Sequence, residues 1–115
     1  MRNRNEESKN RKDEIEMNIA AEKGEGSITL KVEGRVDTIT SPVLQEAILN
    51  NFQKTGCLIL DFAGVEYVSS AGLRALLIGE KTAKGKGGSM KLIHVAPSVM
   101  SVFEVTGFIS ILHIE

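Results

Sequence analysis

The stretch CLILDFAGVEYVSSAGLRALL, residues 57–77, decides the fold, because a strand pattern leads into a helix pattern there. Cys57 to Leu60 are continuously apolar, as expected of a central strand that is buried on both faces of a sheet. AGVEY, residues 63–67, predicts a loop. A helix is expected to begin at Ser69-Ser70 and to bury one face. The apolar residues of that face are Leu73, Leu76 and Leu77. A serine pair therefore stands at the junction of the two patterns.

Upstream of this stretch, two runs of alternating apolar residues flank the glycine turn GEG, residues 24–26. The apolar residues are Ile15, Met17 and Ile19 in the first run, and Ile28, Leu30 and Val32 in the second. Period-two runs around a glycine turn predict an antiparallel hairpin with one solvated face. In the next segment, Ser41 is expected to cap a helix that has Pro42 at its first position. The apolar face of that helix consists of Leu44, Ala47, Ile48 and Phe52.

Downstream of the same stretch, lysines and glycines in residues 81–88 mark the end of the helix that starts at the serine pair. MKLIHV, residues 90–95, predicts a strand, Pro97 opens a short helix, and ISILHI, residues 109–114, predicts a last strand. The element order is therefore ββαβαβαβ. Strands separated by helices indicate parallel crossovers, so we expect an α/β fold with helices packed on a mixed sheet.

The overall composition is that of a soluble globular domain. The chain has 115 residues, of which 42% are hydrophobic and 25% charged, and its formal net charge is −1. Such a balance gives no strong field for nucleic acid or an anionic membrane. The single cysteine, Cys57, lies in a strand-like run and predicts a buried structural thiol in a reducing compartment. Because no stretch approaches the ~20 apolar residues that cross a bilayer, we expect a cytoplasmic protein.

The first twelve residues differ from the rest in composition. Residues 1–12 contain one apolar side chain, Met1, so they cannot repay the entropy cost of ordering. We expect a disordered charged tail over residues 1–12 and a single domain over residues 13–115. Glu6 and Glu7 interrupt the basic residues of the tail, which disfavours an arm that binds nucleic acid.

Metal and hydrolase sites are both disfavoured by the residue patterns. The only histidines, His94 and His113, lie between apolar neighbours and lack the spacing of metal ligands. We expect surface or edge-strand positions for both, and no metal site. A serine hydrolase needs G-x-S-x-G around its nucleophile, whereas Val68 takes the place of the first glycine before Ser70. The chain is therefore not expected to be an enzyme.

The serine pair Ser69-Ser70 supports two interpretations. A serine at a helix start commonly accepts a hydrogen bond from a free backbone N–H. The same place suits a phosphate, because the amides and the macrodipole favour an anion. In the free domain such an anion gains only about 0.3–1 kcal/mol, so the fold is expected to survive modification. In a packed interface an unpaired dianion costs several kcal/mol, and about 3 kcal/mol weakens binding more than 100-fold. A phosphate there would act as a binding switch.

The chain resembles a STAS domain, and more narrowly the bacterial anti-sigma factor antagonists. The resemblance runs from about Glu14 to Ile114, and LDFAGVEYVSSAGLRALL is its most specific part. The other matching stretches are GRVDTITSPVLQEAI, KLIHVAPSVMSVFEVTGF and ISILHI. The resemblance implies a STAS-like mixed sheet in which the N-terminal hairpin precedes the parallel crossovers.

The function that the resemblance implies is partner switching. The unphosphorylated antagonist binds an anti-sigma factor, which is a serine kinase of the histidine-kinase-like ATPase type, and thereby frees a sigma factor. The kinase uses ATP to phosphorylate a serine of the antagonist, which then dissociates, and a metal-dependent serine phosphatase restores binding. The antagonist itself needs no cofactor in this scheme.

The family acceptor is the serine two residues before the glycine at this helix start, which is Ser70 here. Many members have aspartate just before the acceptor, where this chain has Ser69, so Ser69 is the alternative acceptor. Asp37 and Asp61 match acidic positions of the family pattern, near the same end of the sheet. We expect Asp37 on the partner surface, whereas Asp61 is either on that surface or a structural acceptor in a loop. The expected partner-binding residues are Asp37, Thr38, Ser69, Ser70, Ala71, Gly72 and Arg74.

A second difference from the family lies at the end of the sequence. Many STAS domains carry a further helix after the last strand, whereas this sequence stops at Glu115. We expect an exposed apolar strip, with weak self-association as a homodimer or coverage by a partner. The alternative function is a STAS interaction subunit with a client outside sigma control, such as a signalling scaffold or a membrane transporter.

Overall fold

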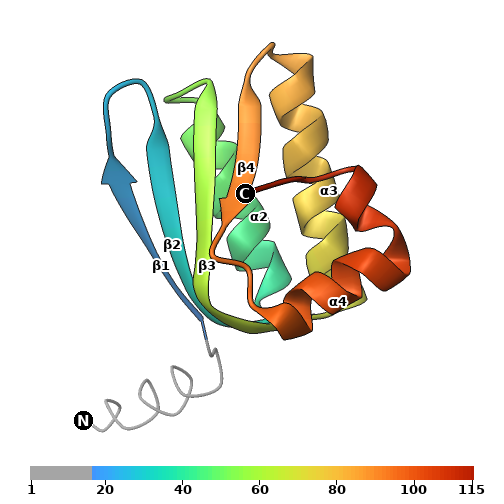
Figure 1. The fold of residues 1–115 in the computed structure, drawn as a ribbon. Helices are drawn as coiled ribbons and strands as arrows, with labels where there is room; N and C mark the ends of the chain where they lie inside the picture. Colours follow the sequence, from blue (N-terminus) through green and yellow to red (C-terminus); the bar gives the residue numbers. More distant parts are fainter. Residues whose placement is uncertain (1–16) are drawn as a thin grey trace, which may run out of the picture.

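The computed structural model describes residues 17–115 (Figure 1). The expected tail of residues 1–12, and Ile15 of the first expected strand, lie outside the described residues. The helices and strands are β1 (Met17–Lys23), β2 (Ile28–Val36), α2 (Ser41–Phe52), β3 (Cys57–Val68), α3 (Ser70–Gly85), β4 (Ser89–Ile93), α4 (Pro97–Thr106), the 3-10 helix η1 (Phe108–Ser110) and β5 (His113–Ile114). Apart from η1, this order confirms the expected ββαβαβαβ arrangement.

The five strands form one mixed sheet in the order β1-β2-β3-β4-β5. β1 pairs antiparallel with β2 through the expected hairpin, and each later pair of neighbouring strands is parallel. Parallel neighbours need crossover connections, and α2 and α3 supply the first two of them. These two helices lie together behind the sheet in Figure 1, whereas α4 lies at one end, against the end of β3.

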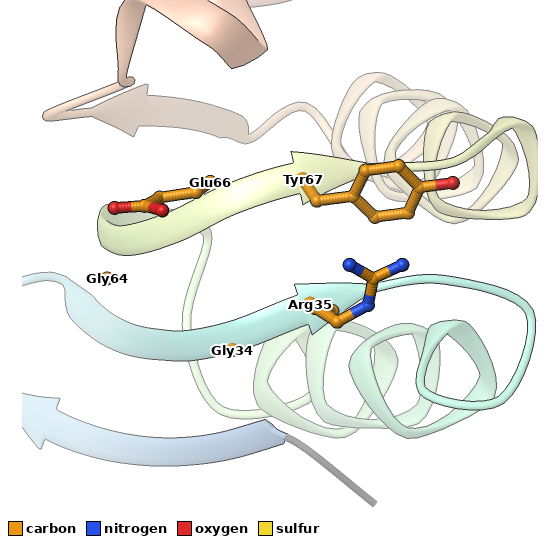
Figure 2. Close-up of a pocket in the computed structure, with 5 residues that line it drawn as sticks. All are labelled: Gly34, Arg35, Gly64, Glu66 and Tyr67. Carbon is orange, nitrogen blue, oxygen red and sulfur yellow. The ribbon is translucent and has the colours of Figure 1, made fainter.

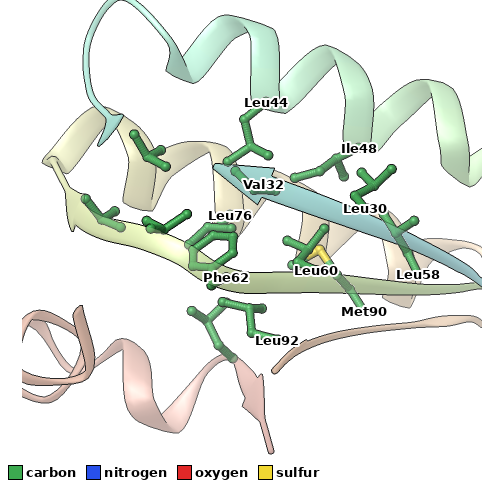
Figure 3. Close-up of a cluster of buried hydrophobic side chains, with 14 of the residues drawn as sticks. Leu30, Val32, Leu44, Ile48, Leu58, Leu60, Phe62, Leu76, Met90 and Leu92 are labelled. Atoms are coloured by element: carbon green, nitrogen blue, oxygen red, sulfur yellow. The ribbon is translucent and has the colours of Figure 1, made fainter. Parts of the chain in front are cut away.

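The hydrophobic core lies between the sheet and the helices. Figure 3 shows side chains of α2 and α3 meeting side chains that point from β2, β3 and β4. The largest fully buried side chains include Phe52, Phe62 and Phe103. Burying such a cluster is the main favourable term in folding, and it fixes α2 and α3 relative to the ends of the strands.

β3 is longer than the sequence pattern predicts, because AGVEY continues the strand and does not form a loop. Parallel pairing with β2 runs on to Val36 and Val68, with register shifts that accommodate the irregular residues. At Gly64 a Cβ atom would lie 2.8 Å from Cγ of Glu33, so a glycine is needed for this close approach. The extension carries β3 beyond the end of β4 and moves the start of α3 away from Asp61.

The sheet is buried on one face only, which corrects the prediction for Cys57 to Leu60. Leu58 and Leu60 are fully buried under the helices, whereas Cys57 and Ile59 point to the other face and are half-buried. Cys57 is a free thiol and is less buried than expected. The face without α2 and α3, called the open face below, carries ion pairs such as Lys31–Glu22. An apolar run therefore does not prove that both sides of a strand are covered.

The boundaries of two other elements also differ from the prediction. α2 begins at Ser41, with Thr40 at the cap position, one residue earlier than expected. Residues 108–110 form η1, and only His113 and Ile114 form β5, so ISILHI is not a six-residue strand. Ile109 and Ile111 are exposed, as is Val105 of α4. Apolar side chains are therefore exposed near the C-terminal end, and self-association through them stays a prediction.

Candidate functional site

The candidate site lies where the parallel strands β2 and β3 end side by side. The backbone N–H of Ser69, just after β3, donates a hydrogen bond of 2.8 Å to the carbonyl oxygen of Val36, the last residue of β2. This bond joins the segment that starts at Asp37 to the start of α3. Residues that are more than thirty positions apart in sequence thus share one surface, at the edge where parallel α/β sheets place their ligands.

The two serines of this site differ in their hydrogen bonding. Ser69 is the N-cap of α3, with extended backbone angles, and its Oγ accepts a 3.3 Å hydrogen bond from the N–H of Gly72. Ser69 is half-buried. Ser70 is the first residue of the helix and is exposed, and within residues 17–115 its hydroxyl has no hydrogen-bond partner. The structural task of capping therefore falls to Ser69, and the hydroxyl of Ser70 is accessible from solvent.

Asp37 shapes the turn between β2 and α2. Its Oδ1 accepts hydrogen bonds of 3.0 Å from the N–H groups of both Ile39 and Thr40. The bond from the N–H of Thr40 is the main reason that the pKa of Asp37 lies below its ordinary value. Its Oδ2 lies 3.6 Å from Nε of Arg35. Asp37 is thus a half-buried carboxylate that is already used to form the turn, and a contact with a partner would be additional.

One hollow lies on the open-face side of the site, between the ends of β2 and β3 (Figure 2). It has a volume of about 450 Å³ and is lined by Gly34, Arg35, Gly64, Glu66 and Tyr67. The guanidinium of Arg35 lies over the ring of Tyr67, 4.2 Å from its centroid, whereas Glu66 points away from this pair. The sequence pattern did not predict these residues as a site, because AGVEY predicts a loop and the pairing of β2 with β3 through residues 34–36 and 65–68 is a tertiary contact that no single segment reveals.

A second hollow, called the α2–α3 hollow below, lies between the first turns of α2 and α3. Its volume is about 340 Å³, and it is lined by Thr38, Ser41, Pro42, Gln45, Ala71 and Arg74. Three residues of the expected partner surface, Thr38, Ala71 and Arg74, are therefore brought together here. Gly72 is buried instead, and a Cβ atom on it would lie 2.6 Å from Cγ1 of Val36. Its role is the close approach of α3 to the end of β2.

Asp61 does not belong to this site, which corrects the expectation that it lies near Asp37. It pairs with Lys31 within the sheet and lies eight residues before Ser69, which at about 3.3 Å per residue is roughly 25 Å along the strand. Its Oδ1 lies 2.9 Å from Nδ1 of His94 and 3.0 Å from the N–H of Ala63. Burial raises the pKa of Asp61, but these hydrogen bonds outweigh burial and hold the pKa below its ordinary value. Asp61 is a structural acceptor.

The two histidines occupy the kinds of position that the sequence predicts. His94 is exposed just after β4, and His113 is exposed in the edge strand β5. Among residues 17–115, no three His, Cys, Asp or Glu side chains are grouped so that they could hold a metal ion. In the same residues, no helix combines the length and apolar composition needed to cross a membrane.

Comparison with known proteins places these features in a family. Residues 18–115 match the STAS domain family. The chain is 27% identical over 101 residues to the anti-sigma-B factor antagonist of Bacillus subtilis, covering 88% of this chain and 93% of that protein. The fold is similar to the crystal structure of an anti-sigma factor antagonist from Mycobacterium paratuberculosis, with a TM-score of 0.77, 23% identity, and coverage of 85% and 84% of the two chains. It is also similar to the Bacillus cell fate determinant SpoIIAA in its phosphorylated form, with a TM-score of 0.65, 17% identity, and coverage of 85% and 91%.

Proposed function

Because this chain belongs to the STAS domain family, we propose that it is an anti-sigma factor antagonist that is controlled by phosphorylation of Ser70. In the unphosphorylated state it binds an anti-sigma factor with serine kinase activity, and a sigma factor is released. It acts in the cytoplasm as a binding protein and not as an enzyme. The names of its relatives support the antagonist function.

The observation that carries the choice of Ser70 is the division of roles between the two serines. Oγ of Ser69 accepts a 3.3 Å hydrogen bond from the N–H of Gly72, whereas Ser70 is exposed. A kinase must bring the acceptor oxygen in line with the γ-phosphorus of ATP, which requires an accessible hydroxyl. That Ser70 is the more accessible of the two supports it as the acceptor and Ser69 as the cap.

The proposed modification is a phosphoryl transfer from ATP. A bond forms between Oγ of Ser70 and the γ-phosphorus, while the bond to the β–γ bridging oxygen breaks and ADP leaves. The hydroxyl proton passes to a base of the kinase, and a serine phosphatase later hydrolyses the phosphoserine with water. At the start of α3 the phosphate gains a little from the helix dipole, so the fold is retained. In the partner interface the same dianion would be desolvated, so binding is lost.

A phosphorylation assay with site-resolved mass spectrometry tests the proposal. The full chain, Ser69→Ala and Ser70→Ala are incubated with the anti-sigma factor kinase of the same organism and ATP. We expect one phosphate on the wild type and on Ser69→Ala, and none on Ser70→Ala. Phosphate on Ser69 alone would show that Ser69, and not Ser70, is the phosphate acceptor. The absence of any phosphate at either serine would refute the phosphorylation control.

A binding assay tests the antagonist function separately from the modification. Isothermal titration calorimetry with the same kinase is expected to give binding for the wild type and Ser70→Ala, and much weaker binding for Ser70→Asp. Release of the sigma factor from its complex with the kinase should follow the same order. Binding to a transporter or a signalling scaffold, without binding to an anti-sigma factor, would favour the alternative client.

A further inference from the structure

The α2–α3 hollow next to Ser70 has a basic side chain in its lining, and an exposed apolar residue follows two of its lining residues in sequence. Arg74 is exposed on one side of the hollow. Ile39 and Val43 each follow a lining residue in sequence, and their exposed fractions are 63% and 43%. Scattered exposed apolar residues are ordinary, but two beside a hollow and a cation give the mixed apolar and charged surface that is typical of recognition sites.

The two arginines near the end of the sheet are in different electrostatic situations. Arg35 is held by Asp37 at 3.6 Å and lies over the ring of Tyr67. Arg74 has no carboxylate within 4.0 Å among residues 17–115, and it is exposed. Arg74 is therefore the arginine whose charge is available for an acidic group from outside the domain, and a guanidinium suits a carboxylate because it can donate two parallel hydrogen bonds.

Building on the proposed function, we propose that the α2–α3 hollow is the docking site for a segment of the anti-sigma factor kinase that carries a carboxylate beside apolar side chains. The carboxylate pairs with Arg74, and the apolar side chains cover Ile39 and Val43. Charge complementarity to Arg74 is the reason for choosing an acidic segment, and the exposure of Ile39 and Val43, next to lining residues in sequence, is the reason for the apolar side chains beside it.

In this arrangement a phosphate on Ser70 and the carboxylate of the partner compete for the guanidinium of Arg74. Arg74 lies four residues after Ser70 on α3, and side chains at this spacing are neighbours on the surface of a helix. A phosphate on Ser70 is therefore within reach of the same guanidinium that the partner needs. Phosphorylation then opposes binding in two ways, since it adds a charge at the interface and withdraws Arg74 from the carboxylate of the partner.

Binding of the purified kinase to full-chain variants tests the docking site. We expect Ile39→Ala and Arg74→Ala each to weaken binding about five- to tenfold, a loss typical of truncating an interface residue that contributes to affinity without being a central hot spot. The matched controls are Val105→Ala, which truncates a distant exposed apolar residue, and Lys81→Ala, which removes a charge two turns further along α3. Both controls are expected to bind like the wild type. Unchanged affinity in Ile39→Ala and Arg74→Ala would overturn the docking site, even when Ser70→Asp abolishes binding.

A second measurement needs no partner and isolates the competition for Arg74. The phosphoserine of the phosphorylated protein titrates near pH 6, and its titration can be followed by ³¹P nuclear magnetic resonance. An adjacent guanidinium favours the dianion, so the titration midpoint should be higher in Arg74→Ala than in the wild type and in Lys81→Ala. Equal midpoints in Arg74→Ala and the wild type would overturn the competition. If the wild type neither binds the kinase nor accepts a phosphate, the proposed function itself fails.

Discussion

Replacing Ser69 or Ser70 by alanine should separate folding from function at adjacent positions. In the structure, Oγ of Ser69 accepts a hydrogen bond from the N–H of Gly72, whereas Ser70 is exposed. Loss of a serine N-cap typically costs about 0.5–2 kcal/mol. Because the capping distance of 3.3 Å is long for a hydrogen bond, we expect the lower part of that range, about 0.5–1 kcal/mol, for Ser69→Ala.

The size of this effect is measurable by thermal unfolding. For a domain of this length, about 1 kcal/mol corresponds to roughly 4–8 °C in Tm, so Ser69→Ala should lower Tm by about 2–8 °C. Ser70→Ala should change the free energy of unfolding by less than about 0.5 kcal/mol, as an exposed side chain without partners does. Circular dichroism at the helical band, with heat and with urea, measures both variants.

Ser69→Asp provides the matched control for the capping argument. Aspartate is as good an N-cap as serine, and its charge lies at the favourable end of α3, so stability should equal or exceed that of the wild type. If Ser70→Ala were destabilised as strongly as Ser69→Ala, or if Ser69→Asp unfolded as easily as Ser69→Ala, the assignment of the cap to Ser69 would be wrong.

Three further substitutions test other parts of the structure. Gly72→Ala should lower the free energy of unfolding by about 1–3 kcal/mol in urea titrations, because its Cβ would lie 2.6 Å from Cγ1 of Val36; an unchanged urea midpoint would contradict this close approach. Glu80→Gln should be neutral or stabilising in the same assay, since Oε1 of Glu80 is buried without a hydrogen-bond partner among residues 17–115 and its Oε2 lies 4.0 Å from Nζ of the exposed Lys84, a weak pair; a clear loss of stability would contradict this reasoning. Asp61→Asn should reduce the loss of stability in acid: the folded pKa of Asp61 is lowered, so its contribution is present above about pH 4 and disappears as the pH falls through the lowered value. Identical acid arms of the pH–stability curves for Asp61→Asn and the wild type would show that its bonds to His94 and Ala63 contribute nothing.

The elements that the sequence predicts well are those whose pattern is set by one local cause. The period-two runs on both sides of residues 24–26 form a hairpin because one face of β2 is buried and Met17 and Ile19 of β1 pack, partly buried, against the same core. The helix that follows Ser69 forms because a cap, an apolar stripe and a lysine- and glycine-rich end all agree. The position of the candidate site was predictable for the same reason, since it lies at the junction of two strong patterns.

The elements that were missed depend on tertiary contacts that a single segment does not reveal. Residues 63–67 become strand because β2 continues beside them, with register shifts that no local pattern shows. Cys57 and Ile59 remain half-buried because α2 and α3 both cover the opposite face. The predicted position of Asp61 was wrong because residues 63–67 extend β3. A shorter β3 would have brought Asp61 close to the serines. The separate roles of Ser69 and Ser70 follow from their backbone angles, which the amino-acid sequence alone does not give.

The order of the strands in the sheet has a consequence for how the protein is made. From β2 onwards, each strand forms hydrogen bonds with the strand directly before it in the chain, so a strand leaving the ribosome finds its neighbour already synthesised. The residues from Asp37 to Arg74 that build the serine-bearing surface all belong to the first 74 of the 115 residues. β4, α4 and β5 therefore contribute packing of the core behind that surface and no residue to the surface itself.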